Sequence, residues 1–309
     1  MIDRRCLLFS AAALAAPRAL AQSPGKLSVL ASFTILADLV GAVGGDRLAV
    51  TAMVGPGGDA HVFQPAPTDA KRVADARLVV INGLHFEGWM ERLIEASGAK
   101  PRVVVASEGV KPRDNPDLHD DHGHKKQDRH GHSHAVDPHA WQSAQNVKIY
   151  VGNIARALAA ADPEGAAVYA ANAQAYGREL EALDAEIRAA VATLPQARRK
   201  VVTTHDAFGY FADAYGLQFI APKGVSSQTE ASARDVARII RQIRTEKIPA
   251  VFLENISDPR QMQRIAQETG ARIGGALFSD SLTAPDGPAP TYIAMMRHNI
   301  RELTKALAA

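Results

Sequence analysis

Histidine is concentrated in one short stretch of this chain. Residues 119–134 read HDDHGHKKQDRHGHSH and hold six of the eleven histidines of the protein. Closely spaced imidazoles on a polar segment can capture Zn, Cu or Ni ions with little geometric demand. A tract this polar cannot bury enough apolar surface to offset the entropy lost on ordering it. We therefore expect a mobile loop that collects metal ions. A solvated linker with incidental histidines is the alternative. The histidines are His119, His122, His124, His130, His132 and His134.

A seventh histidine, His139, follows in a different setting, the sequence DPHAW. Its neighbours Pro138 and Trp141 could fix the direction of the imidazole through the backbone and through ring packing. We therefore expect two kinds of metal binding, one at an ordered site that includes His139 and one on the adjacent histidine-rich loop.

The N-terminus has the pattern of an export signal. Arg4 and Arg5 precede an apolar run, and residues 19–21, Ala-Leu-Ala, have the small-x-small form of a signal-peptidase site. We therefore predict that residues 1–21 are removed and that the mature protein is periplasmic. The sequence allows export by either the Sec or the twin-arginine route. Cys6, the only cysteine, lies in the removed segment. Histidine and carboxylate are then the strong metal ligands of the mature chain.

The composition is that of a globular protein. Removal of the signal leaves about 288 residues, enough for two domains with proper cores. A hydrophobic content of 47% and a formal net charge of +2 argue against a disordered chain and against a nucleic-acid binder.

Strands and helices alternate on either side of a purely helical middle. Such alternation implies βαβ units on parallel sheets, so the predicted fold class is α/β with two lobes. The middle, residues 143–194, breaks only at Asp162-Pro163, and a helix from residue 163 to 194 would form a rigid spine about 50 Å long. We divide the chain into an N-terminal lobe (22–142), linking helices (143–194) and a C-terminal lobe (195–309). Strands are predicted at 26–33, 47–54, 77–83, 102–107, 200–205, 217–222, 250–255 and 271–278.

Candidate ligands follow several of these strands. Ligands of parallel sheets bind outside the carboxyl ends of the strands. His61 follows the strand that ends at Val54, His205 ends its own strand and Asp280 follows another, while His139 comes from the lobe junction. Three imidazoles and one carboxylate would complete a tetrahedral zinc shell between the lobes.

Other residues compete for these roles or support them. Water, Asp286 or Glu254 could replace Asp280 as the fourth ligand. Asp137 and Asp206, by adjacency, are candidates to fix the imidazole tautomers. We interpret His85 as a structural or rim residue, His298 as solvated, and Trp89 and Trp141 as core residues.

Several motifs resemble those of a known family. HVFQPAPTD, NGLHFEGW, DPHAW, THDAFGYF and FSDS are similar to motifs of the cluster A-I solute-binding proteins of metal ABC importers, over nearly all of the mature chain. Zinc-type members have histidine at the position of His205, where manganese-type members have glutamate. Many zinc members also carry a histidine-rich loop. A disulfide found in the second lobe of some zinc members has no counterpart here.

The resemblance implies a C-clamp of two lobes on a rigid helix, with small lobe movements. It implies that His61, His139, His205 and Asp280 bind Zn²⁺ and that a membrane ABC permease is the partner. We expect a monomer whose histidine-rich loop either hands zinc to the ordered site or receives it from a periplasmic metallochaperone. The alternatives are a manganese-binding homologue and a zinc-dependent hydrolytic enzyme with an open three-histidine site. No HExxH or GxSxG motif supports the enzyme.

Overall fold

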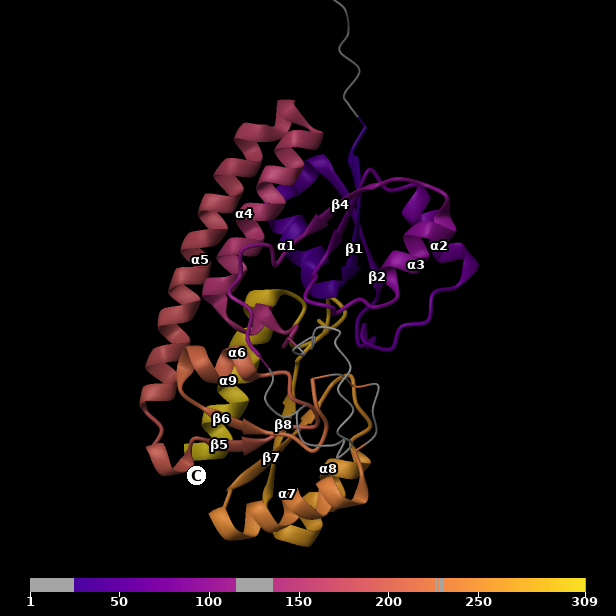
Figure 1. Ribbon diagram of the computed structural model, residues 1–309. Helices are drawn as coiled ribbons and strands as arrows, with labels where there is room; N and C mark the ends of the chain where they lie inside the picture. The colour runs from indigo at the N-terminus through magenta and orange to yellow at the C-terminus, as the bar shows by residue number, and fades with distance from the viewer. Residues whose placement is uncertain (1–24, 115–135, 226, 228–230, 309) are drawn as a thin grey trace, which may run out of the picture.

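The computed structural model describes residues 25–114, 136–225, 227 and 231–308. Two α/β lobes lie one beyond the other along a pair of long helices (Figure 1). The predicted signal segment, residues 1–21, and the histidine tract, residues 119–134, lie outside the described residues.

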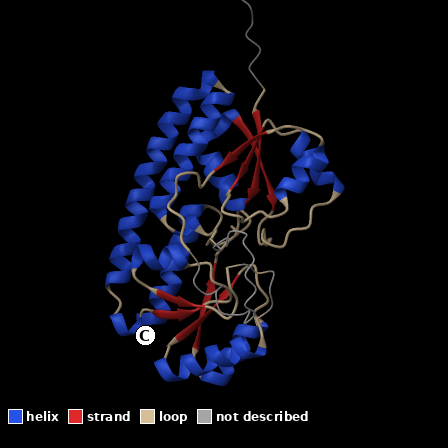
Figure 2. Ribbon diagram, viewed as in Figure 1, coloured by secondary structure: helices blue, strands red, loops and turns tan. Residues whose placement is uncertain are grey.

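The first lobe contains a parallel four-stranded sheet in the order β2-β1-β3-β4. Its strands are short. The residues of β1 and β3 are mostly buried, as expected for a parallel sheet covered on both faces (Figure 2). The elements are β1 (Leu27–Phe33), α1 (Thr34–Gly44), β2 (Leu48–Val54), α2 (Pro67–Ala74), β3 (Leu78–Ile81), α3 (Met90–Ser97) and β4 (Arg102–Val105).

The second lobe repeats this topology with a parallel sheet in the order β6-β5-β7-β8. The two sheets therefore have the same strand order when their strands are numbered along the chain. The elements are β5 (Lys200–Val202), α6 (Gly209–Tyr215), β6 (Gln218–Ile220), α7 (Ala233–Glu246), β7 (Ala250–Glu254), α8 (Arg260–Thr269), β8 (Arg272–Leu277) and α9 (Tyr292–Ala308).

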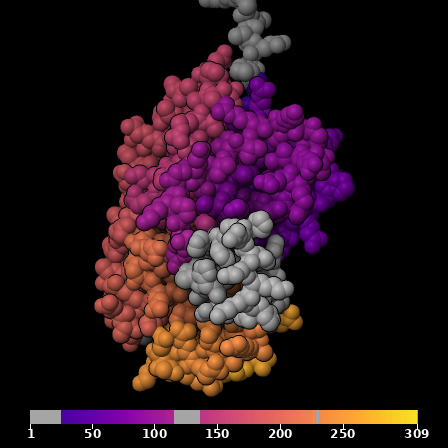
Figure 3. Space-filling view, in the orientation of Figure 1, coloured from indigo at the N-terminus to yellow at the C-terminus, as the bar shows by residue number. Residues whose placement is uncertain are grey.

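The linking helices α4 (Ala144–Ala161) and α5 (Ala166–Ala192) run side by side along one edge of the molecule (Figures 1 and 3). Helix α4 lies beside the first lobe, and the longer α5 continues past the second. Between them, a 3-10 turn at Pro163–Gly165 marks the predicted break. The side chains of α5 at the predicted helical spacing are buried: Tyr176, Leu180, Leu183, Ile187 and Val191. Because α5 contacts both α1 and α9, one hydrophobic core continues from the first lobe through the helices into the second.

Two lobes with parallel sheets and a long helix are thus confirmed, although several strands are shorter than predicted. The strand predicted at 200–205 ends at Val202. The backbone N–H groups of Thr204 and His205 donate to the Glu254 carboxylate, 2.7 and 3.0 Å away, instead of to a neighbouring strand. None of the described helices combines the length and the apolar character needed to cross a bilayer.

Candidate metal centre

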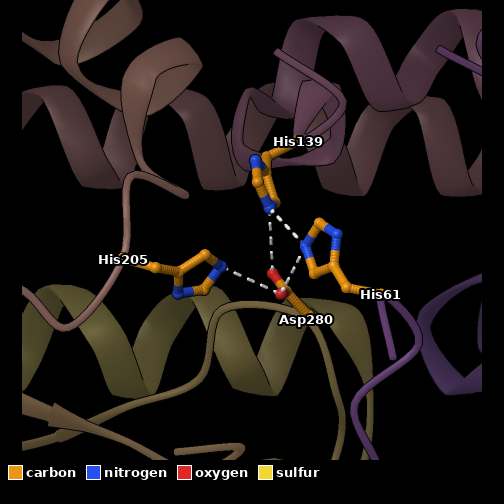
Figure 4. Close-up of side chains that lie close together, drawn as sticks. All are labelled: His61, His139, His205 and Asp280. Carbon is orange, nitrogen blue, oxygen red and sulfur yellow. Dashed lines mark hydrogen bonds and ion pairs between the residues drawn. The ribbon is translucent and has the colours of Figure 1, made fainter. Parts of the chain in front are cut away.

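Four side chains meet between the lobes (Figure 4): His61, His139, His205 and Asp280. One nitrogen or oxygen of each lies within 4.8 Å of those of the other three. His61 comes from the loop after β2, and His139 immediately precedes the 3-10 turn Ala140–Gln142. His205 and Asp280 follow β5 and β8 of the second lobe. Each lobe therefore contributes two of the four groups.

The four groups face one another through their Nε2 and carboxylate oxygen atoms. The Nε2 atoms of His61 and His139 are 3.1 Å apart, and Nε2 of His205 is 3.1 Å from Oδ2 of Asp280. Oδ2 of Asp280 is 3.4 Å from Nε2 of His61, and its Oδ1 is 3.6 Å from Nε2 of His139. Ligands about 2.0–2.1 Å from a tetrahedral zinc ion are separated by about 3.3 Å. The four distances given above, 3.1 to 3.6 Å, bracket this value.

Burial shields these polar groups from bulk solvent. His139, His205 and Asp280 are 0% exposed and His61 is 6% exposed. Oδ1 of Asp280 accepts no hydrogen bond in the described residues. A buried carboxylate oxygen without a donor is costly unless a cation offsets its charge. Fully buried donor atoms converging on one point are what a bound metal ion requires.

Carboxylates orient two of the imidazoles from behind. Oδ1 of Asp137 is 2.8 Å from Nδ1 of His139, and Oε2 of Glu254 is 2.6 Å from Nδ1 of His205. The first contact is a hydrogen bond and the second a close ion pair; each favours a proton on Nδ1 and leaves Nε2 to bind a metal. The contact of Asp137 was predicted. The carboxylate behind His205 is that of Glu254, whereas the sequence pointed to Asp206 for this role and to Glu254 as a rival ligand.

The charges at the centre shift the pKa values in opposite directions. Burial raises the pKa of Asp280, but His139 and His205 outweigh it and hold that pKa well below its usual value. Burial lowers the pKa of His205, but Glu254 and Asp280 raise it well above its usual value. For His61, burial dominates and lowers the pKa. In the metal-free protein the raised pKa of His205 therefore favours its doubly protonated, cationic form, which lies between the carboxylates of Glu254 and Asp280.

Aromatic rings hold the imidazoles in place. Phe86 packs edge-on against His61, with ring centroids 4.5 Å apart, and Trp141 packs against His139 at 5.2 Å. Phe86 follows a turn in which Gly83, Leu84 and His85 all have positive φ. This role of Phe86 was not predicted, because the motif NGLHFEGW does not reveal which ring faces the ligands.

The remaining candidates lie elsewhere. His85 is exposed, as a rim residue would be, and Asp286 is exposed in the loop before α9. His298, predicted to be solvated, is half-buried because its ring packs against Phe278 and Nε2–H donates to the carbonyl of Ala276. Trp89 and Trp141 are buried, as predicted.

The fold and the site together define a class, the metal-binding substrate-binding proteins of ABC transporters. The family model described as zinc-uptake complex component A, periplasmic, matches residues 29–306, and the chain belongs to this family. Members of the family are binding proteins and not enzymes, so the hydrolytic alternative is set aside.

Relatives and solved structures agree with this assignment. The chain is 34% identical to "Iron-binding protein YfeA" of Yersinia pestis, over 91% of this chain and 86% of the relative. It is 32% identical to "Manganese-binding lipoprotein MntA" of Halalkalibacterium halodurans, over 91% of this chain and 89% of the relative. The structure of the periplasmic zinc binding protein TroA from Treponema pallidum superposes with a TM-score of 0.82 at 30% identity, covering 92% of this chain and 100% of that chain.

Proposed function

We propose that this protein captures Zn²⁺ in the periplasm through His61, His139, His205 and Asp280 and delivers it to a membrane ABC permease. The observation that carries the proposal is the donor set, three imidazoles and one carboxylate whose ligand atoms all lie within 4.8 Å of one another. Mn²⁺ is better suited by carboxylate, carbonyl and water oxygens, whereas imidazole suits zinc. Manganese or iron transport, suggested by the names of the two relatives, is the second candidate.

The carboxylates behind the imidazoles support the same proposal. Asp137 and Glu254 are completely or almost completely buried, so their contacts to Nδ1 do not compete with bulk water. A carboxylate partner raises the basicity of a metal-binding imidazole and fixes its direction. Three nitrogen ligands, at least two of them oriented in this way, favour tight binding of a borderline ion such as Zn²⁺.

We further propose that residues 119–134 assist zinc acquisition, as a collector for the ordered site or as the receiver from a metallochaperone. The described residues at either side of this segment support a link to the centre. Asp114 and Val136 form an antiparallel bridge, and the N–H of Asp137 donates to the carbonyl of Arg113. The described residues that flank positions 115–135 on both sides therefore lie beside the carboxylate that contacts His139. We also propose that cleavage after residue 21 removes the signal segment and that the mature protein is a monomer.

The proposal is tested by metal content. Protein starting at residue 22 is purified without a histidine tag, beside a variant lacking residues 119–134, and both are equilibrated with equal Zn²⁺ and Mn²⁺. Mass spectrometry should find one zinc retained by each after dialysis. Zinc retained only when residues 119–134 are present would make that segment the main binder and refute the ordered site. Manganese retained in preference to zinc would establish the second candidate.

A further inference from the structure

Arg113 lies where the first lobe, the metal centre and the second lobe meet. Its Nη1 is 3.4 Å from Oδ2 of Asp137, and its Nε donates to Oδ2 of Asp213 at 3.0 Å. Its backbone N–H donates to the hydroxyl oxygen of Tyr210 at 2.9 Å, and its carbonyl accepts from the N–H of Asp137. Asp213 and Tyr210 both belong to α6 of the second lobe. One residue thus connects Asp137 with α6.

On one side, Arg113 reaches the metal centre through a single carboxylate. Asp137 is 0% exposed, and its two oxygens have different partners. Oδ1 is 2.8 Å from Nδ1 of His139 and also accepts the backbone N–H of His139 at 3.0 Å, while Oδ2 faces Arg113. A displacement of Arg113 therefore acts on the carboxylate that sets the direction of the His139 ring.

On the other side, Arg113 reaches the segment that carries His205. Helix α6 begins at Gly209, four residues after His205. A Cβ atom at Gly209 would lie 2.3 Å from Nη1 of Arg113 and 2.5 Å from Oδ2 of Asp137. The ion pair therefore occupies the space that the missing side chain leaves, and the backbone of α6 lies directly against it. The imidazoles of His139 and His205 have ring centroids 5.3 Å apart across the same junction.

We propose that Arg113 is a positioning residue of the metal site. By binding Asp137 and Asp213 at once, it fixes the separation of His139 and His205, and that separation favours a small tetrahedral ion over one that prefers more ligands at longer distances. Arg113 slows metal release and sharpens the preference for zinc, although it contacts no metal. A planar guanidinium suits this task because it can face two carboxylates at fixed angles. The inference rests on the proposed function for the identity of the metal.

The experiment compares four variants of the mature protein. Arg113→Met removes both ion pairs. Arg113→Lys keeps the charge but lacks the planar guanidinium that faces the two carboxylates. Asp213→Asn loosens only the contact to α6; the Asp213 side chain is 65% exposed, so folding should not depend on it. Gly209→Ala crowds both the guanidinium and Oδ2 of Asp137, so it disturbs their ion pair while every charge is retained. The matched control is Arg188→Met, because Arg188 contacts the other end of α6 through the carbonyl of Ala214.

Release of Zn²⁺ and of Mn²⁺ into excess chelator is followed by stopped flow, and the visible absorption of bound Co²⁺ reports the coordination geometry. Arg113→Met should release zinc about tenfold faster, with a smaller change for manganese and weaker tetrahedral Co²⁺ bands. Asp213→Asn should accelerate zinc release about two- to fivefold. Gly209→Ala should change release and spectrum in the same direction, and Arg113→Lys should restore part of the loss.

Two results would overturn the inference. One is release at the wild-type rate, with an unchanged Co²⁺ spectrum, from Arg113→Met, Gly209→Ala and Asp213→Asn. The other is equal acceleration by Arg188→Met, which would mean that loosening either end of α6 has the same effect. If the wild type retains manganese instead of zinc, the proposed function fails, and the ratio of variant to wild-type release rates for manganese still tests the role of Arg113.

Discussion

Oε2 of Glu254 lies 2.6 Å from Nδ1 of His205, while Oε1 of the same carboxylate accepts the N–H groups of Thr204 and His205. The buried Glu254 side chain thus accepts the backbone N–H groups just after strand β5, where the strand ends. The same side chain contacts the imidazole of His205 and fixes its direction. The backbone and the imidazole of His205 are positioned by the same group, so neither can move independently of β7.

Glu254→Gln should weaken zinc binding about 10- to 100-fold. The amide oxygen can still accept the two backbone N–H groups, but the amide nitrogen is a donor and cannot accept the proton on Nδ1 of His205. The imidazole then loses the partner that keeps Nε2 free for metal. Titration against a competing chelator measures the change, with the exposed Glu246→Gln as control. An unchanged dissociation constant would show that Glu254 serves the fold alone.

Zinc binding should release about one proton at pH 7. The pKa of His205 is raised, so this imidazole is protonated in the metal-free protein, whereas Asp280, with its lowered pKa, is ionised and His61, with its lowered pKa, is neutral. Below the pKa of His205, apparent affinity should therefore fall about tenfold per pH unit. Calorimetry in buffers of different ionisation enthalpy counts the proton. An affinity that stays constant between pH 6 and 8 contradicts this assignment.

Exchanging the ligand chemistry requires two substitutions. His205→Glu alone would bring a second carboxylate against Glu254, and two buried carboxylates at this distance repel unless one is protonated. The double variant His205→Glu, Glu254→Gln removes that conflict and supplies an oxygen ligand. It should bind manganese better relative to zinc than the wild type, by about tenfold or more. A preference equal to that of the single His205→Glu variant would mean that Glu254 has no part in selection.

Asp38 should make the protein less stable as the pH rises from about 4 to 6. Burial raises its pKa to about 6, and the backbone N–H of Tyr292, at the start of α9, only partly offsets this effect. The folded protein therefore binds the proton more tightly than the unfolded chain, so stability is highest below the unfolded pKa and is lost through this window. The loss is at most about 3 kcal/mol.

Asp38→Asn keeps an oxygen for the N–H of Tyr292 and removes the charge. Urea unfolding at pH 4, 5, 6 and 7 should show higher stability than the wild type at pH 7 and a flatter dependence on pH. A wild-type slope that survives the substitution would assign the pH dependence to another group.

Much of the fold could be predicted because local patterns determine it. The alternation of strands and helices and the apolar face of the spine follow from periods of two and 3.6 residues. The rule that parallel strands present ligands at their carboxyl ends led to His61, His205 and Asp280. That these three residues and His139 bind metal stays a prediction until metal content is measured.

The partners of the ligands were harder to predict, because they depend on which strands are neighbours. Asp137 lies two residues from its histidine, so adjacency in the sequence was enough. Glu254 lies on β7, which pairs with β5, and that pairing cannot be read from the sequence around His205. The strand that begins at Lys200 was predicted too long for the same reason. The backbone N–H groups of Thr204 and His205 donate to Glu254 on β7.

The hydrophobic core that continues through both lobes and α5 has a consequence for the lifetime of the protein. This core joins the two lobes, so loss of packing in one lobe weakens the other, and an ion bound at the lobe junction protects core residues far from it; a second cluster around α7 and α8 lies outside this core. At a free concentration 100 times the dissociation constant, a bound ligand adds about 2.7 kcal/mol to the stability. The metal-loaded protein would then resist proteases that degrade the empty one, and metal scarcity would lower the number of protein molecules as well as their occupancy.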